Sequence, residues 1–430
     1  MKGPDCCSRL ILIMPLGCAA SASPNMAGVY ALLRQYVIEK FPEIANDSVQ
    51  INHTVNRLVM SSADIIMNTN GLPYSVRKQG AGLANLTNSA LTPAYIMTYD
   101  RKTGELMDKT KIELGDDPAK TGVYELTFSV CNFGTTALTY DVSAYVMTEG
   151  VSETKTNHGQ TTVTEQGYRL DGAKIELVYV NNATENGTNI TIGANTTATV
   201  KVKITLSDAD KAYLNNSFEN GMYVEGFVTL TAVTGTTVDL NVPYLGFYGD
   251  WSVAPIFDID YYATNKDELD DSIDLLDKTL ADAYATRPIG QVELDYVSYL
   301  GSYYFYQDPA AKKISADRKY ISLSNQDGTI HNLKYVWAGL LRNAARVEIT
   351  ITDDATGEVI FEKVENDIRK SYGDGGTPYP ANIEIDFDAS TQNLKNNAKY
   401  TVTLKGYLDY ENDGADTNKS NTFTFPYKQV

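Results

Sequence analysis

Apolar residues near the start of the chain recur at the spacing of an α-helix. In the stretch from Ser23 to Lys40 they fall at i, i+3, i+4, i+7 and i+8, which predicts one apolar stripe on a buried helix. Ser23 is a suitable N-cap residue and Pro24 suits the first helical position, so we expect the helix to begin there. The stripe consists of Val29, Leu32, Leu33, Tyr36 and Val37.

Further along the chain, apolar and polar residues alternate with the period of a β-strand. Clusters of Gly, Asn and Thr separate these segments, and the polar stretch 181–196 is expected to be a hairpin excursion. The 30 tyrosines also favour strands. The pattern predicts a mainly β protein with two β-sandwiches. The alternating segments include Val123–Val130, Leu138–Met147, Thr197–Thr205, Met222–Leu230, Ala398–Tyr407 and Phe423–Tyr427.

Between the two sets of strands lies an acidic connector. Asn265 can cap a helix whose apolar face would hold Leu269, Ile273, Leu276 and Leu280. The carboxylates between Asp267 and Asp277 could suggest calcium, but the glycine and the spacing of a calcium loop are missing. A solvated helix face is the better interpretation.

Composition narrows the classes of function. The net charge of −18 argues against nucleic acid and anionic membranes as partners, because both would repel the chain. Of the four cysteines, Cys131 stands alone and the others crowd the first 18 residues, so no metal spacing is present. Apart from this N-terminus, no apolar run approaches the ~20 residues of a membrane span.

Residues 1–21 have two interpretations. A short apolar run, Leu10–Leu16, followed by small residues resembles a signal peptide, or a lipoprotein leader with Cys18 as the acylated cysteine. Asp5 sits in what would be the positive region, and cleavage near Ala20 would leave the core helix at the new terminus. We therefore favour a non-native segment ahead of a truncated domain.

The helix also carries a family resemblance. Ser-Pro-Asn-Met-Ala-Gly-Val-Tyr-Ala-Leu-Leu (23–33) resembles the helix that follows the nucleophile in subtilisin-like serine proteases, whose pattern is G-T-S-M-A-x-P-x-x-A-G. In an ungapped alignment Ala22, Pro24, Ala27 and Gly28 match, but the nucleophile position holds Ala20. Only about twenty residues precede the helix, so the Asp and His of the family's triad have no place in this chain.

Later motifs extend the resemblance to cell-envelope proteinases of the lactocepin and complement-peptidase group. Arg77-Lys-Gln-Gly-Ala-Gly-Leu-Ala-Asn is similar to the segment that closes their catalytic domain. Asn220-Gly-Met-Tyr-Val-Glu-Gly-Phe-Val-Thr-Leu and Val242-Pro-Tyr-Leu-Gly-Phe-Tyr-Gly-Asp-Trp resemble the fibronectin-III-like domain that follows it. Leu340-Leu-Arg-Asn-Ala resembles a strand of the next domain, where the turn near Asp327 is a doubtful calcium candidate, since Leu323 and Gln326 replace the family's Pro and Gly.

The resemblance implies a division into five parts. These are a non-native or signal-like segment (1–21), a remnant of a subtilisin-like α/β catalytic domain (22–100), a fibronectin-III-like sandwich (101–250), an acidic helical connector (251–297) and a second fibronectin-III/Ig-like sandwich (298–430).

Two hypotheses for function follow. The first is the C-terminal part of an extracellular or cell-envelope bacterial serine endopeptidase that acts on proteins or peptides, inactive by itself, with no catalytic residue, cofactor or metal of its own. His53, His158 and His331 have no defensible Ser and Asp partners in the sequence. The second is a non-catalytic surface-binding or adhesive module of tandem sandwiches. In either case the stripe Val29–Val37 would lack the sheet that covers it in subtilisins, and we expect it to cause self-association.

Overall fold

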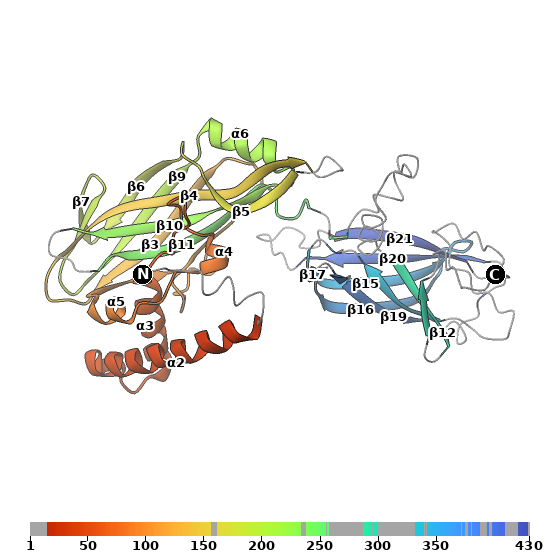
Figure 1. The fold of residues 1–430 in the computed structure, drawn as a ribbon, viewed down its shortest axis with the longest axis horizontal. Helices are drawn as coiled ribbons and strands as arrows, with labels where there is room; N and C mark the ends of the chain where they lie inside the picture. The colour runs from red at the N-terminus through yellow and green to blue at the C-terminus, as the bar shows by residue number, and fades with distance from the viewer. Residues whose placement is uncertain are drawn as a thin grey trace. The chain divides into compact units, whose positions relative to one another are not determined.

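The computed structural model describes residues 15–155, 161–233, 238–254, 256–257, 287–293, 296–299, 332–338, 340, 342–370, 372–374, 377–379, 381–387, 394, 398–408 and 420–428. The chain divides into two compact units, Met1–Trp251 and Ser252–Val430, which are described separately. Figure 1 shows the N-terminal helices of the first unit in red to orange, and its strands and one later helix in orange to green.

The first unit begins with a helical segment. Its elements are α2 (Pro15–Lys40), the 3₁₀ turn η1 (Pro42–Ile44), α3 (Ser48–Ser61), α4 (Val76–Gln79) and α5 (Leu86–Leu91). The predicted start of the first helix at Ser23 is wrong, because α2 already begins at Pro15 and Pro24 lies inside it. A proline there removes one backbone hydrogen bond, and the strong helix formers just before it, Ala19, Ala20 and Ala22, favour continuation.

The predicted apolar stripe is partly covered within the chain itself. Leu33 and Val37 are fully buried in a small core with residues of α3 and with groups from α5 and β1. Leu32 is 56% exposed, because α3 and α5 cover the face centred on Leu33 and Val37 and leave Leu32 on a neighbouring face. The expectation that the whole stripe is unpartnered is therefore wrong for its central residues.

The rest of the first unit is a two-layer β-sandwich. One sheet has the order β1-β3-β9-β6, and the other has the order β2-β11-β10-β4-β8-β7 with β5 paired to β4. The strands are β1 (Ala94–Thr98), β2 (Ile112–Asp117), β3 (Val123–Asn132), β4 (Leu138–Lys155), β5 (Thr161–Arg169), β6 (Lys174–Asn181), β7 (Ala183–Asn186), β8 (Asn189–Ile192), β9 (Thr196–Thr205), β10 (Met222–Ala232) and β11 (Leu240–Tyr248).

Alternation in the sequence becomes alternation of burial in these strands. In β3 the inward residues Tyr124, Leu126 and Phe128 are buried, and the residues between Tyr124 and Phe128 that face outward are exposed. The inward sets of both sheets form one continuous apolar core. The mainly β prediction is confirmed.

Two local expectations need correction. The predicted boundary at residue 100 does not separate two domains, because β1 pairs with β3 along its whole length and so belongs to the sandwich. The stretch 181–196 does contain a hairpin, β7 and β8, but it is not merely an excursion. Ile190 and Ile192 of β8 are fully buried, and β8 pairs with β4.

The second unit also has two four-stranded sheets. Their orders are β13-β12-β14-β19 and β16-β15-β20-β21, and β17 and β18 form a separate two-stranded sheet. Among the described residues of this unit, most of the apolar core comes from β15, β19 and β20. The strands are β12 (Arg287–Glu293), β13 (Tyr296–Tyr299), β14 (Asn332–Ala338), β15 (Ala344–Asp353), β16 (Val359–Ile368), β17 (Tyr372–Asp374), β18 (Thr377–Tyr379), β19 (Ala381–Phe387), β20 (Lys399–Tyr407) and β21 (Ser420–Lys428).

Several predictions concern residues outside those that the structure describes. They include the helix from Asn265 with its carboxylates, the turn at Asp327, and the histidines His158 and His331. Within the described residues, none of the helices combines the length and the apolar character needed to cross a membrane.

Candidate functional site

The most elaborate polar site in the described part of the first unit lies where the helical segment meets the sandwich. We call it the Arg77 joint and define it by Ser75, Arg77, Glu149 and Glu225. Local contacts hold the short helix α4 that carries Arg77. Ser75 is its N-cap and accepts a hydrogen bond from the Arg77 backbone N–H at 3.2 Å. The Gln79 side chain accepts from the backbone N–H of Ile66 and donates to the carbonyl of Tyr74 at 2.7 Å.

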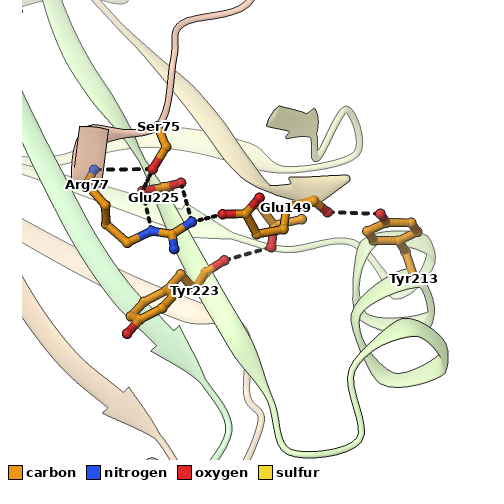
Figure 2. A network of polar contacts seen from close by, with 7 residues as sticks. Ser75, Arg77, Glu149, Tyr213, Tyr223 and Glu225 are labelled. Carbon is orange, nitrogen blue, oxygen red and sulfur yellow. Dashed lines mark hydrogen bonds and ion pairs between the residues drawn. The ribbon is translucent and has the colours of Figure 1, made fainter. Parts of the chain in front are cut away.

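Arg77 reaches from α4 to two strands of the sandwich. Its guanidinium donates to the Glu225 carboxylate of β10 through Nε at 3.3 Å and through Nη2 at 3.2 Å, and Nη2 also pairs with Glu149 of β4. Figure 2 shows the guanidinium between the two carboxylates, with the Tyr223 ring beside it. The ring centroid lies 4.4 Å from the Arg77 carbon Cζ, a distance suited to a cation–π contact.

Burial makes Glu225 the critical partner. Its side chain is 3% exposed, whereas that of Arg77 is 32% exposed. A buried carboxylate is costly unless it is paired and hydrogen-bonded, and here Arg77 pairs with it while the Ser75 hydroxyl donates to it at 2.8 Å. The phenol of Tyr244 is fully buried close by. Burial first, and the Glu225 charge second, raise the pKa of Tyr244 well above its usual value.

A glycine beside Glu225 allows the strands to approach closely. Gly226 has φ +159°, and a Cβ at this position would lie 1.9 Å from the backbone oxygen of Tyr145 on β4. The same oxygen accepts a hydrogen bond from the Tyr244 hydroxyl at 2.9 Å. Only glycine fits this close approach of two strands.

Gly82 has the same role on the helical side. Its φ is +120°, and a Cβ would lie 2.4 Å from the oxygen of Asp64. The Gly-Ala-Gly motif thus brings two backbone segments close together at Gly82.

Further hydrogen bonds connect the elements around the joint. The Glu149 carbonyl accepts from the Tyr213 hydroxyl of α6 (Asp208–Ser217) at 3.0 Å. On β11, the strand next to β10, the Asn241 side chain donates to the backbone oxygen of Ala63 at 2.7 Å, and this bond is buried. The backbone N–H of Ile96 on β1 also donates to the Ser61 hydroxyl of α3 at 2.8 Å, so the helical segment is bonded to the sandwich at several separate places.

The chemistry of the joint is structural. Ser75 donates to a carboxylate and caps a helix, and no histidine contacts the joint among the described residues. In the same part of the chain, no group of three or more His, Cys, Asp or Glu residues is arranged to hold a metal ion. His53 lies on α3, away from the joint and partly exposed. Ala20, at the aligned nucleophile position, lies in α2, and Asp327 is outside the described residues.

Sequence reasoning singled out the segments of the joint but not their contact. Arg77 opens one quoted motif and Glu225 lies in another, and the two are 148 positions apart. A glutamate followed by glycine within an otherwise apolar strand was a usable sign of a buried, paired carboxylate.

Comparison with known proteins agrees with these motifs. Residues 112–245 match the family described as Fn3-like domain. The chain is 26% identical to the PII-type proteinase of Lacticaseibacillus paracasei over 426 residues, which cover 95% of this chain and 20% of that protein. It is also 26% identical to the PI-type proteinase of Lactococcus lactis subsp. cremoris, again over 95% of this chain and 20% of the relative.

A third relative is the C5a peptidase of Streptococcus pyogenes serotype M1, which is 24% identical over 58% of this chain and 19% of that protein. The chain therefore spans about a fifth of the length of these relatives. Their bacterial origin agrees with the predicted extracellular or cell-envelope location in a bacterium. The resemblance to cell-envelope proteinases and C5a peptidases is confirmed, and the sandwich of the first unit contains an Fn3-like domain.

Proposed function

We propose that this chain is the C-terminal part of an extracellular subtilisin-like serine endopeptidase, and that it supports the catalytic domain without cleaving substrate itself. The helical segment would complete that domain and the Arg77 joint would fix the Fn3-like sandwich to it. The similarity to proteinases along 95% of the chain supports the origin. The hydrogen bonds from Arg77 to the buried Glu225 carboxylate support the second role. They join the motif that resembles the end of the catalytic domain to a motif that resembles the Fn3-like domain.

The exposed face of α2 supports the same proposal. Ala27, Gly28 and Ala31 are exposed, and the neighbouring Leu32 is 56% exposed. Small residues permit close approach of another backbone, so we infer that the upstream part of the catalytic domain packs on this face in the longer protein. In the chain alone the same face is expected to promote self-association, and a Leu32→Glu variant should then sediment as a smaller species.

A segment exchange tests the supporting role. This chain would replace its aligned segment in the PII-type proteinase, and casein cleavage would be compared with that of the parent and of a variant lacking the segment. We expect the hybrid to cleave casein and the deletion variant to be inactive. An inactive hybrid that nevertheless folds, as judged by circular dichroism and gel filtration, would contradict the proposal.

The chain by itself is expected to be inactive, because the aligned nucleophile position holds Ala20. Incubation with a serine-directed fluorophosphonate probe should give no stoichiometric labelling, and casein should stay intact. Labelling of one serine at equal stoichiometry would show that the chain has a catalytic site of its own.

A further inference from the structure

The first unit has a groove between two strand edges that the Arg77 joint does not involve. β2 is the outermost strand of its sheet and pairs only with β11 among the described strands. β3 is covered by β1 only from Phe128 to Asn132, so residues 123–127 have a strand partner on one side, β9, and none of the described strands on the other. Residues of both free edges line a single cavity of about 460 Å³.

The floor of the groove is apolar. Ile112 and Tyr124 are buried, and Leu114 packs against the same core. Tyr124 is 5% exposed, and its hydroxyl has no hydrogen-bond partner among the described residues. Burial raises the pKa of this phenol, so it remains a neutral donor. Tyr124 therefore adds apolar surface to the floor, whereas its hydroxyl is itself buried and is not available to a ligand in the groove.

The rim of the groove is acidic. Two of its carboxylates have nearby lysine partners, Lys111 for Glu113 and Lys201 for Glu125. The aspartates of the rim accept hydrogen bonds from backbone N–H groups, which orient their carboxylates. The charged lining residues are Asp100, Glu113, Asp116, Asp117 and Glu125 on the acidic side and Arg101 on the basic side.

We propose that this groove binds an extended peptide segment by strand addition to the free edge of β3. The backbone groups of residues 123–127 that point away from β9 would supply the hydrogen bonds, as in other cases of β-augmentation, except the Val123 N–H, which already donates to the Thr121 hydroxyl at 3.2 Å. An apolar side chain of the segment would lie on Ile112 and Tyr124, and flanking lysines or arginines would face the rim. This proposal is independent of the origin of the chain as a protease fragment.

The test is binding of a designed peptide to the full chain. The probe is a fluorescein-labelled decapeptide of alternating Lys and Val, measured by fluorescence anisotropy. One control peptide has Glu in place of Lys, and a second has the original side chains but a methyl group on every backbone nitrogen, which removes all its donors. We expect saturable binding of the first peptide and at least tenfold weaker binding of both controls.

Two protein variants locate the site. Glu113→Gln with Glu125→Gln removes rim charge, and Glu185→Gln on the exposed part of β7 is the matched control. We expect several-fold weaker binding for the double variant and no change for the control.

Hydrogen exchange gives a direct readout of strand addition. Bound peptide should slow exchange of amides between residues 123 and 127 while leaving those of β6, the opposite edge of the sheet, unchanged. The proposal is overturned if the Lys-Val peptide does not bind, if the N-methylated peptide binds equally well, or if protection appears elsewhere.

Discussion

The helical segment of the first unit contacts its surroundings in two very different ways. At α4 the contact is polar and closed, because Arg77 is bonded to two carboxylates and one of these, Glu225, is almost completely buried. At α2 the contact is apolar and half open, because Leu33 is buried whereas Leu32 is 56% exposed. The α4 side of the segment is therefore covered within this chain, whereas one face of α2 is left exposed.

The two contacts also differ in how strictly they define geometry. A buried ion pair with a shared hydroxyl donor tolerates few arrangements, since any shift leaves a charge unpaired. An apolar helix face tolerates small shifts at little cost. We therefore expect substitutions at the joint to be more damaging than substitutions on α2.

Tryptophan fluorescence can follow the first unit alone. The chain has two tryptophans, and Trp251 packs against Phe247 and Tyr223 with ring centroids 5.0 and 5.6 Å away. Replacing Trp337 by Phe leaves Trp251 as the single reporter, close to the ring that contacts Arg77. Urea unfolding of this background gives the free energies of unfolding compared below.

The largest effect is expected from Gly226→Ala. The added Cβ would clash with the Tyr145 oxygen, so β4 and β10 must separate next to Glu225. We expect a loss of about 4 kcal/mol in the free energy of unfolding. A loss below about 1 kcal/mol would show that the strands can separate freely.

Arg77→Met should come next, with a loss of about 3 kcal/mol, because it leaves the buried Glu225 carboxylate with Ser75 alone. Lys174→Met is the matched control. Lys174 forms an exposed pair with Glu176, at 69% and 37% side-chain exposure, and its removal should cost no more than about 0.5 kcal/mol. Equal losses in the two variants would contradict the importance of burial at the joint.

Leu33→Ala should cost about 2 kcal/mol, since it opens a cavity in the small core between α2 and α3. Leu32→Ala should change the free energy of unfolding by less than about 0.5 kcal/mol, because Leu32 makes little contact within the chain. A reversed order would mean that the face of α2 that carries Leu32, rather than the face that carries Leu33, is the buried one.

Gly28→Ala should have a small effect of the opposite sign. No atom lies within 4 Å of the Cβ that this substitution would add. Alanine favours the helix over glycine, so we expect a gain of about 0.5–1 kcal/mol. A loss instead would indicate that the face of α2 is covered in the chain alone, for example by a second copy.

Local pattern was enough to predict several of the longer strands. Alternation placed β3, β9 and β10 within two residues of their observed ends. In β3 and β9 the reason is that one face is buried, whereas the middle of β10 is buried on both faces. β2 was missed, since Ile-Glu-Leu-Gly-Asp-Asp has only one apolar alternation before its glycine. The helix α6 was also missed, although Ser207 and Asp210 form a capping box that the sequence displays.

The contacts of the joint were beyond local pattern. Arg77 and Glu225 are 148 residues apart, and Asn241 and Ala63 are 178 apart. The spacing of apolar residues within either segment does not indicate which strand contacts which helix. The burial of Leu33 but not of Leu32 depends likewise on where α3 and α5 lie, which the sequence of one helix cannot reveal.

A double-mutant cycle at Arg77 and Glu225 tests the central claim most directly. Unfolding of Arg77→Met, Glu225→Gln and the combined variant would be followed by Trp251 fluorescence. The joint predicts a coupling energy of about 1.5 kcal/mol or more, because the combined variant no longer buries an unpaired charge. Additive losses, within about 0.3–0.5 kcal/mol, would show that the two residues do not act together and that other contacts hold the helical segment on the sandwich.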